Sequence, residues 1–137
     1  MRLTMTVSLP QRAASVAVAR DMFAVLLRLT TADEQVRDRL AVALTEACAN
    51  VVQHGDPAAT IDLHIVVEAG RCVLEVGNRG HGPDGGPLLA HRPDPAQLSG
   101  RGLPLIAALS DSAEFVPAPP GYVLLRITQR LQASVQE

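Results

Sequence analysis

Aromatic residues are nearly absent from this sequence of 137 residues, which contains no tryptophan, one tyrosine and two phenylalanines. Proteins that bind single-stranded nucleic acid stack its bases on aromatic side chains, so this mode of binding is not expected. A basic excess is lacking as well, because 12 Lys and Arg stand against 14 Asp and Glu, for a net charge of −2. Nucleic-acid-binding domains usually present a basic face. The sequence therefore predicts no direct nucleic-acid partner.

Cysteines and long hydrophobic runs are also scarce. Cys48 and Cys72 lie in apolar segments without C-x-x-C spacing, which favours buried thiols in a reducing compartment over a disulfide or metal site. The longest apolar stretch, 13–29, is interrupted by Arg20 and Asp21 and cannot span a bilayer. The first residues lack the apolar run of a signal peptide. We expect a cytoplasmic protein that does not enter the membrane.

Apolar residues make up 47% of the chain, enough at this length for one hydrophobic core, so we expect a single domain over 1–137. Alternating apolar and polar residues predict strands, and apolar residues at helical spacing predict helices. In chain order these are a strand at 2–9, helices at 11–29 and 30–55, strands at 60–68 and 72–77, a helix at 103–110, and strands at 113–117 and 122–129. This order predicts an α+β fold, a two-layer sandwich with helices on one face of a mostly antiparallel sheet.

The second expected helix, 30–55, has recognisable ends. Thr31 and Glu34 have the spacing of a capping box at its start. Gly55 is a typical residue for its C-terminal stop. The helix is therefore expected to run uninterrupted through its apolar middle part.

Three polar side chains recur at four-residue intervals within this helix. Glu46, Asn50 and His54 follow at i, i+4 and i+8, so they share one helical face. The surrounding sequence is almost entirely apolar, and an acid and an amide in such surroundings need partners or a polar cavity. An ordinary solvated stripe is the alternative interpretation, and the spacing alone does not separate the two.

A glycine- and proline-rich stretch, 79–99, separates the two halves of the chain. It holds four Gly and four Pro without sustained periodicity, and long structureless loops in small domains are usually functional or disordered. A Gly-x-Gly-x-x-Gly pattern begins at Gly80, but no helix follows it. We therefore interpret that match to the dinucleotide-binding fingerprint as chance.

A second glycine pair opens the third expected helix. Gly100 and Gly102 flank Arg101 directly before the apolar segment. Backbone N–H groups at a helix start, beside an arginine, suit a phosphate group. A plain glycine-rich turn before a helix is about equally common, so this motif alone leaves both interpretations open.

The order of these motifs resembles the ATP-binding fold of gyrase and sensor histidine kinases. The segment ALTEACANVVQHG (43–55) is similar to the N box of that fold. LEVGNRGHG (74–82) is similar to its first glycine box, and GRGLPLIAALSD (100–111) to its second. With a strand and a helix ahead of the N box, the chain most resembles the anti-sigma factor serine/threonine kinases.

This resemblance implies roles for the N box and the second glycine box. Asn50 would ligate a Mg²⁺ that bridges the phosphates of ATP, a reasonable role for a neutral amide oxygen. Glu46, one turn earlier, would be the general base for a hydroxyl of a protein substrate. Gly100, Arg101 and Gly102 would meet the phosphates.

In the first glycine box, the resemblance implies that Asn78, Gly80 and Gly82 line the nucleotide site, with 79–99 as a lid. Asn78 replaces the aspartate that usually accepts a hydrogen bond from the adenine amino group. An asparagine amide can rotate to present either its oxygen or its NH₂ group. We therefore expect weak ATP binding with little preference over GTP.

The function that the resemblance implies is a regulator that sequesters a sigma factor and phosphorylates an anti-anti-sigma protein on Ser or Thr. The alternative is a non-catalytic partner-binding module of the same fold, with weak or no nucleotide dependence. Glu46 favours the kinase, whereas Asn78 favours the binding module. Related proteins pair as dimers around the first strand and helix, so a homodimer is one alternative, and the sequence leaves the oligomeric state open.

Overall fold

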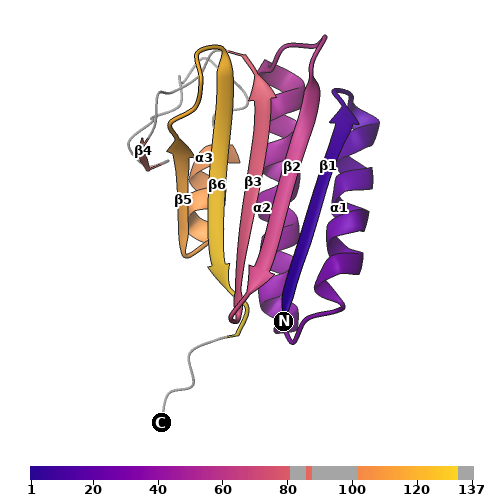
Figure 1. Cartoon of the computed structure of the whole chain (residues 1–137), viewed down its shortest axis with the longest axis vertical. Coiled ribbons are helices and arrows are strands. Elements are labelled where there is room, and N and C mark those ends of the chain that lie inside the picture. Colours follow the sequence, from indigo (N-terminus) through magenta and orange to yellow (C-terminus); the bar gives the residue numbers. More distant parts are fainter. Residues whose placement is uncertain (81–85, 88–101, 133–137) are drawn as a thin grey trace.

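The computed structural model describes residues 1–80, 86–87 and 102–132 (Figure 1). The elements are β1 (Arg2–Pro10), α1 (Ala13–Leu27), α2 (Glu34–His54), β2 (Thr60–Glu68), β3 (Arg71–Arg79), β4 (Gly86–Pro87), α3 (Gly102–Leu109), β5 (Ser112–Val116) and β6 (Tyr122–Arg130). Each strand and helix expected from the sequence is present, and the short strand β4 is an addition.

The strands form one sheet in the order β1-β2-β3-β6-β5-β4, and every neighbouring pair is antiparallel. The three helices lie together against one face of this sheet, and Figure 1 shows the other face free of helices. In that view α1 lies behind β1, and α2 runs behind β2 and β3. The α+β two-layer sandwich predicted from the sequence is thereby confirmed.

The core lies between the sheet and the helices because the strands alternate strictly. Along β2, Ile61, Leu63 and Ile65 are buried, whereas the intervening side chains are exposed or half-buried on the open face. This period of two is what a sheet covered on one side requires. The largest fully buried side chains come from α1, α2, α3 and the central strands: Phe23, Leu27, Leu40, Leu44, Ile61, Leu63, Ile65, Leu74, Ile106, Ile127, Cys48 and Cys72.

Two expectations about element ends are wrong. The strand expected to end at Gly77 continues to Arg79, because Asn78 and Arg79 pair in register with β6. The capping box is not formed, because α2 begins at Glu34 and its N-cap residue is Asp33, which makes no side-chain cap hydrogen bond. Thr31 instead accepts hydrogen bonds from the Gln132 side chain, through both its carbonyl and its hydroxyl.

The stretch expected as a lid, 79–99, falls largely outside the described residues. Arg79 at its start belongs to β3, and Gly86–Pro87 pairs with Phe115 and Glu114 of β5, so the stretch is not wholly without regular structure. Among the helices of residues 1–80, 86–87 and 102–132, none combines the length and apolar character needed to cross a bilayer.

Candidate functional site

The polar face of α2 is formed as the sequence predicts. Glu46, Asn50 and His54 lie in one uninterrupted helix, and Gly55 follows as its C-cap residue. Glu46 and Asn50 are half-buried, and His54 is exposed. Leu40, Leu44 and the other core residues occupy a different face of α2. The helix therefore presents an acid and an amide one turn apart, beside its core-packing surface.

Asn50 has an unusual environment for an amide side chain. Its Nδ2 atom is buried and has no hydrogen-bond partner in the part of the chain that the structure describes. A buried amide donor without a partner costs about 1–3 kcal/mol, so such groups are rare and call for a reason. Since no described residue accepts a hydrogen bond from Nδ2, none of them opposes a rotation of the amide that would offer its oxygen to a cation. The position fits a magnesium ligand of the kind that the resemblance implies.

Asn78 is the second-last residue of β3 and is only 3% exposed. Its Oδ1 accepts a hydrogen bond from the Asp56 N–H at 3.2 Å, and its Nδ2 donates to the Thr60 carbonyl at 2.8 Å. Rotating the amide would set oxygen against oxygen and nitrogen against nitrogen. The expectation of an amide that turns freely towards either base is therefore wrong. The side chain holds the α2–β2 connection against β3.

Two glycines converge on this amide. A Cβ atom at Gly55 would lie 2.1 Å from Asn78 Oδ1 and 2.7 Å from the Val51 carbonyl oxygen, so no side chain fits there. A Cβ at Gly80 would lie 3.7 Å from the same Oδ1 and 3.7 Å from the α-carbon of Gly55, which is ordinary contact. The end of the N box and the first glycine box are thus in direct contact.

The contacts of Gly55, Asp56 and Thr60 with Asn78 are not indicated by the local sequence. Gly55 is expected only as a helix stop, yet its φ of −76° is open to any residue. Glycine is needed at this position for space, because the side chain of Asn78, 23 residues later in the sequence, occupies the place of a Cβ atom. No local pattern predicts this contact. It could have been expected only by assuming that the end of the N box and the first glycine box lie side by side.

The phosphate-binding part of the expected site is only partly described. Gly102 is the first residue of α3, so the second glycine box does begin a helix. Gly82, Gly100 and Arg101 lie outside the described residues. The structure therefore brings Gly55, Asn78 and Gly80 together and places Glu46 and Asn50 on α2, and it leaves the contacts of the phosphate motif open.

A second polar cluster lies on the open face of the sheet. Asp62 on β2 accepts hydrogen bonds from the hydroxyls of Ser8 at 2.9 Å, Thr60 at 2.6 Å and Tyr122 at 2.8 Å. The tyrosine ring crosses the strand between them because Gly77 leaves room, since a Cβ there would lie 2.2 Å from the tyrosine oxygen. The cluster ties β1, β2 and β6 together.

This cluster shifts the titration of both its acidic members. Partial burial raises the pKa of Asp62, but the hydroxyl donors outweigh it, with a smaller contribution from the charge of Arg79, so the pKa is lowered. Burial and the hydrogen bond to Asp62 raise the pKa of Tyr122 to about 12, and the negative charges of Asp62 and Glu75 add to this. Hydroxyl donors stabilise the Asp62 carboxylate and so lower its pKa, whereas burial is the largest cause of the raised pKa of Tyr122. The pattern is that of a structural network.

Both cysteines are buried free thiols, as expected. Burial raises the pKa of Cys48 and of Cys72 to about 12, so neither forms a reactive thiolate near neutral pH. Within the described ranges, no group of three His, Cys, Asp or Glu side chains is placed to hold a metal ion. A single amide ligand such as Asn50, completed by phosphate oxygens and water, is compatible with that finding.

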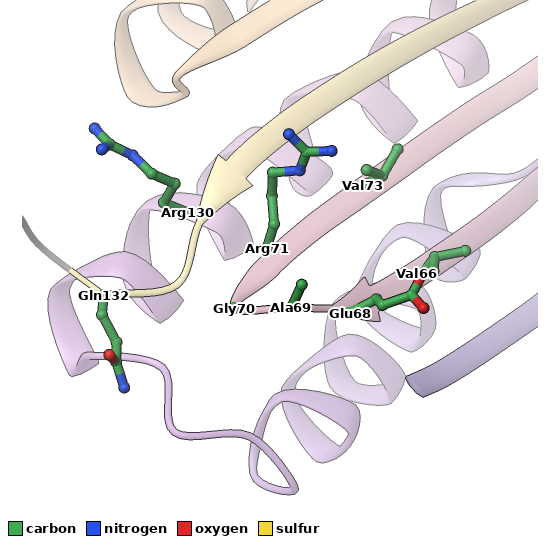
Figure 2. A pocket seen from close by; sticks show the side chains of 8 residues that line it. All are labelled: Val66, Glu68, Ala69, Gly70, Arg71, Val73, Arg130 and Gln132. Atoms are coloured by element: carbon green, nitrogen blue, oxygen red, sulfur yellow. The ribbon is translucent and has the colours of Figure 1, made fainter. Parts of the chain in front are cut away.

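A pocket of about 660 Å³ lies elsewhere, on the open face beside the turn between β2 and β3 (Figure 2). Val66 and Val73 contribute apolar side chains, and Arg71 and Arg130 contribute cationic ones. Arg71 begins β3, whereas Asn78 stands near the strand's other end and on its other face. The pocket is therefore separate from the candidate nucleotide site.

Comparisons with known proteins agree with this fold. A model of the histidine kinase-like ATPase domain matches residues 9–127. No curated protein matches the sequence. Among solved structures, the RsbU and RsbW domains of Rv1364c from Mycobacterium tuberculosis are similar, with a TM-score of 0.70 and 17% identity over 98% of this chain. The present chain spans 34% of that larger protein.

Two further structures share the fold. The SiaB–SiaC complex from Pseudomonas aeruginosa is similar with a TM-score of 0.61 and 17% identity, covering 91% of this chain and 88% of that one. The histidine kinase AdeS from Acinetobacter baumannii is similar with a TM-score of 0.52 and 12% identity, covering 94% and 68%. These likenesses concern the fold, and the domain model covers most of the chain. The chain belongs to the histidine kinase-like ATPase domain family.

Proposed function

We propose that this chain binds ATP with Mg²⁺ and acts as a serine/threonine kinase of the anti-sigma type. The observation that carries the proposal is Asn50, whose buried Nδ2 lacks a partner among the described residues, one turn after a half-buried Glu46. Membership of the ATPase domain family supports the nucleotide. The similarity to the RsbW domain supports the anti-sigma type.

In this proposal each side chain has one task. Asn50 holds Mg²⁺ through its amide oxygen, and Gly100, Arg101 and Gly102 bind the phosphates. When bound, the metal neutralises phosphate charge and orients the terminal phosphoryl group. Glu46 accepts the proton of the attacking serine or threonine hydroxyl as a general base.

The first glycine box surrounds the nucleotide in the same proposal. Asn78, Gly80 and Gly82 lie against the base, and residues 79–99 cover it. Asn78 acts there mainly by fixing the backbone of Asp56 and Thr60, since both of its amide atoms already have partners. The contact of Gly55 with this amide keeps the N box and the glycine box at a set distance.

The second candidate is a partner-binding module of the same fold that does not transfer phosphate. The hydrogen bonds of Asn78 favour it, because a side chain engaged with two backbone groups has less capacity left for a nucleobase. The two candidates differ in one measurable property, the dependence of binding on Mg²⁺ and ATP.

The proposed partners are a sigma factor and an anti-anti-sigma protein, and the proposed assembly is a homodimer. One similar structure is a complex of SiaB with SiaC. On α1, Val18 is 46% exposed and Val25 is 59% exposed. Among the described strands β1 has β2 as its one neighbour and forms an edge of the sheet. An apolar helix face beside an open strand edge supports pairing with a second copy.

The test is titration calorimetry of the purified chain with Mg²⁺-ATP, in the parent and in Asn50→Ala. The variant should weaken Mg²⁺-ATP binding at least about tenfold, because it removes the metal's protein ligand while a helix tolerates alanine. Gln53→Ala is the matched control, since Gln53 is exposed on the same helix turn. Equal affinities in the parent and Asn50→Ala would overturn the proposal and favour the binding module.

A further inference from the structure

A glutamine between β1 and α1 is hydrogen-bonded to the C-terminal end of α2. Gln11 directly follows β1, and its Nε2 donates to the Val51 carbonyl at 2.7 Å and to the Val52 carbonyl at 3.2 Å. These carbonyls belong to the last turn of α2, where helices leave carbonyl groups without intrahelical partners. The Val51 carbonyl also accepts the Gly55 N–H at 2.7 Å, so both of its lone pairs are used.

The orientation of the Gln11 amide is fixed. Turning it over would place Oε1 against the carbonyl oxygens of Val51 and Val52, which is repulsive. In the orientation that the bonds require, Oε1 is buried and has no partner within residues 1–80, 86–87 and 102–132. An unpaired buried acceptor costs free energy, so the two donated bonds outweigh a real penalty.

The segment that carries Gln11 is itself held in place. The buried Ser15 donates its hydroxyl to the Pro10 carbonyl, and the Arg12 N–H donates to the same carbonyl at 2.9 Å. These two hydrogen bonds restrict the backbone conformation between β1 and α1. Because the backbone of Gln11 is restricted, its hydrogen bonds to Val51 and Val52 also restrict the position of the C-terminal end of α2.

We infer that Gln11 is a positioning residue for Asn50, an inference that rests on the proposed nucleotide function. Asn50 directly precedes the two residues whose carbonyls Gln11 binds, so those bonds fix the turn that carries its amide. The same turn leads into Gly55, which contacts Asn78. Gln11 thereby connects the β1–α1 corner to both polar residues of the candidate site.

The test compares Gln11→Met with Gln132→Met in the whole chain. Methionine keeps the length of the side chain and removes its donors. Gln132 is the matched control, because it also binds backbone and hydroxyl groups through Nε2, at Thr31 near the start of α2. Gln11→Met should weaken Mg²⁺-ATP binding about tenfold and leave metal-free ATP binding within about twofold, as expected for the loss of hydrogen bonds that act only on the metal ligand.

A change that merely loosened the fold would weaken binding with and without metal alike, and that result overturns the inference. Gln11→Lys should restore the parent's affinity, because an ammonium group also donates to the last carbonyls of a helix. A lysine variant as weak as Gln11→Met would contradict it too.

A second readout needs no nucleotide, and so separates this inference from the proposed function. Amide hydrogen exchange of Gly55 and Asp56 should be about tenfold faster in Gln11→Met, with Leu44 in the middle of α2 unchanged. If the parent fails to bind ATP but this exchange pattern is found, the proposed function fails and the structural link stands. If exchange at Gly55 and Asp56 does not change, the link itself is absent.

Discussion

The amide nitrogen of Asn78 donates to the carbonyl of Thr60 at 2.8 Å, from a side chain that is 3% exposed. This bond joins the end of β3 to the start of β2, and the oxygen of the same amide binds the Asp56 N–H. An aspartate, which the family usually has at this position, only accepts hydrogen bonds and cannot make the bond to Thr60. An asparagine, with one acceptor and one donor group, therefore satisfies both the Asp56 N–H and the Thr60 carbonyl.

From this relationship we predict that Asn78→Asp destabilises the protein by about 2–3 kcal/mol at neutral pH. The change buries a negative charge and sets a carboxylate oxygen against a carbonyl oxygen. The loss should be smaller in mild acid, where a protonated carboxyl group can donate. Urea unfolding at two pH values measures both effects. A variant as stable as the parent at neutral pH would show that the bond to Thr60 contributes nothing.

Gly55→Ala should destabilise the fold by about 2 kcal/mol or more. Its new Cβ would meet Asn78 Oδ1 at 2.1 Å and the Val51 carbonyl oxygen at 2.7 Å, and overpacking of this kind forces backbone to move. Gly80→Ala is the control, because its nearest contacts would be at 3.7 Å, and its free energy of unfolding should change by less than about 0.5 kcal/mol. Equal losses in thermal unfolding would contradict the steric argument.

Glu46→Gln should retain Mg²⁺-ATP binding and lose phosphoryl transfer about 10²–10⁴-fold, as expected when a general base is removed. The measurement is the transfer of labelled phosphate to candidate anti-anti-sigma proteins. Asn50→Ala should instead fail at the binding step. If the parent binds such a partner tightly without ever phosphorylating it, the partner-binding module is the correct function.

Stability at high pH should depend on Tyr122. Its pKa is raised to about 12, so the folded protein holds this proton more tightly than the unfolded chain does. The contribution is fully present below pH 10 and is lost as the pH rises from about 10 to about 12. Because the chain has one tyrosine, phenolate absorbance reports this group alone.

The matching variant is Tyr122→Phe, which removes the hydrogen bond to Asp62. This variant should lower the free energy of unfolding by about 1 kcal/mol at neutral pH, a modest loss because the tyrosine hydroxyl is partly exposed to solvent. It should also abolish the loss of stability that ionisation of the tyrosine causes at alkaline pH. A tyrosine that titrates near pH 10 in the folded protein would show that the bond to Asp62 is not maintained in solution.

Local sequence patterns were sufficient to predict the order of the longer helices and strands, the layer architecture and the helical face shared by Glu46 and Asn50. Alternation along β2 and helical spacing along α2 are local patterns, and each follows from which side chains must leave water. The β2 boundaries were predicted to the residue, because the alternation stops at both ends. The order of the motifs also indicated the family.

The partners of the polar side chains depend on contacts between segments that are far apart in the sequence. Asn78 and Thr60 are 18 residues apart, and Gln11 and Val51 are 40 apart, so no local pattern predicts their bonds. The end of β3 was predicted two residues too early, because glycine is typical of strand ends. Hydrogen bonding to β6 extends the strand beyond Gly77 to Arg79. Thr31 does not cap α2 as predicted, and its hydroxyl accepts a hydrogen bond from Gln132, 101 residues away. In each case a hydrogen bond between distant segments decides the outcome. For Asn78 and Gln11 the physical reason is burial, which makes an unpaired donor or acceptor costly.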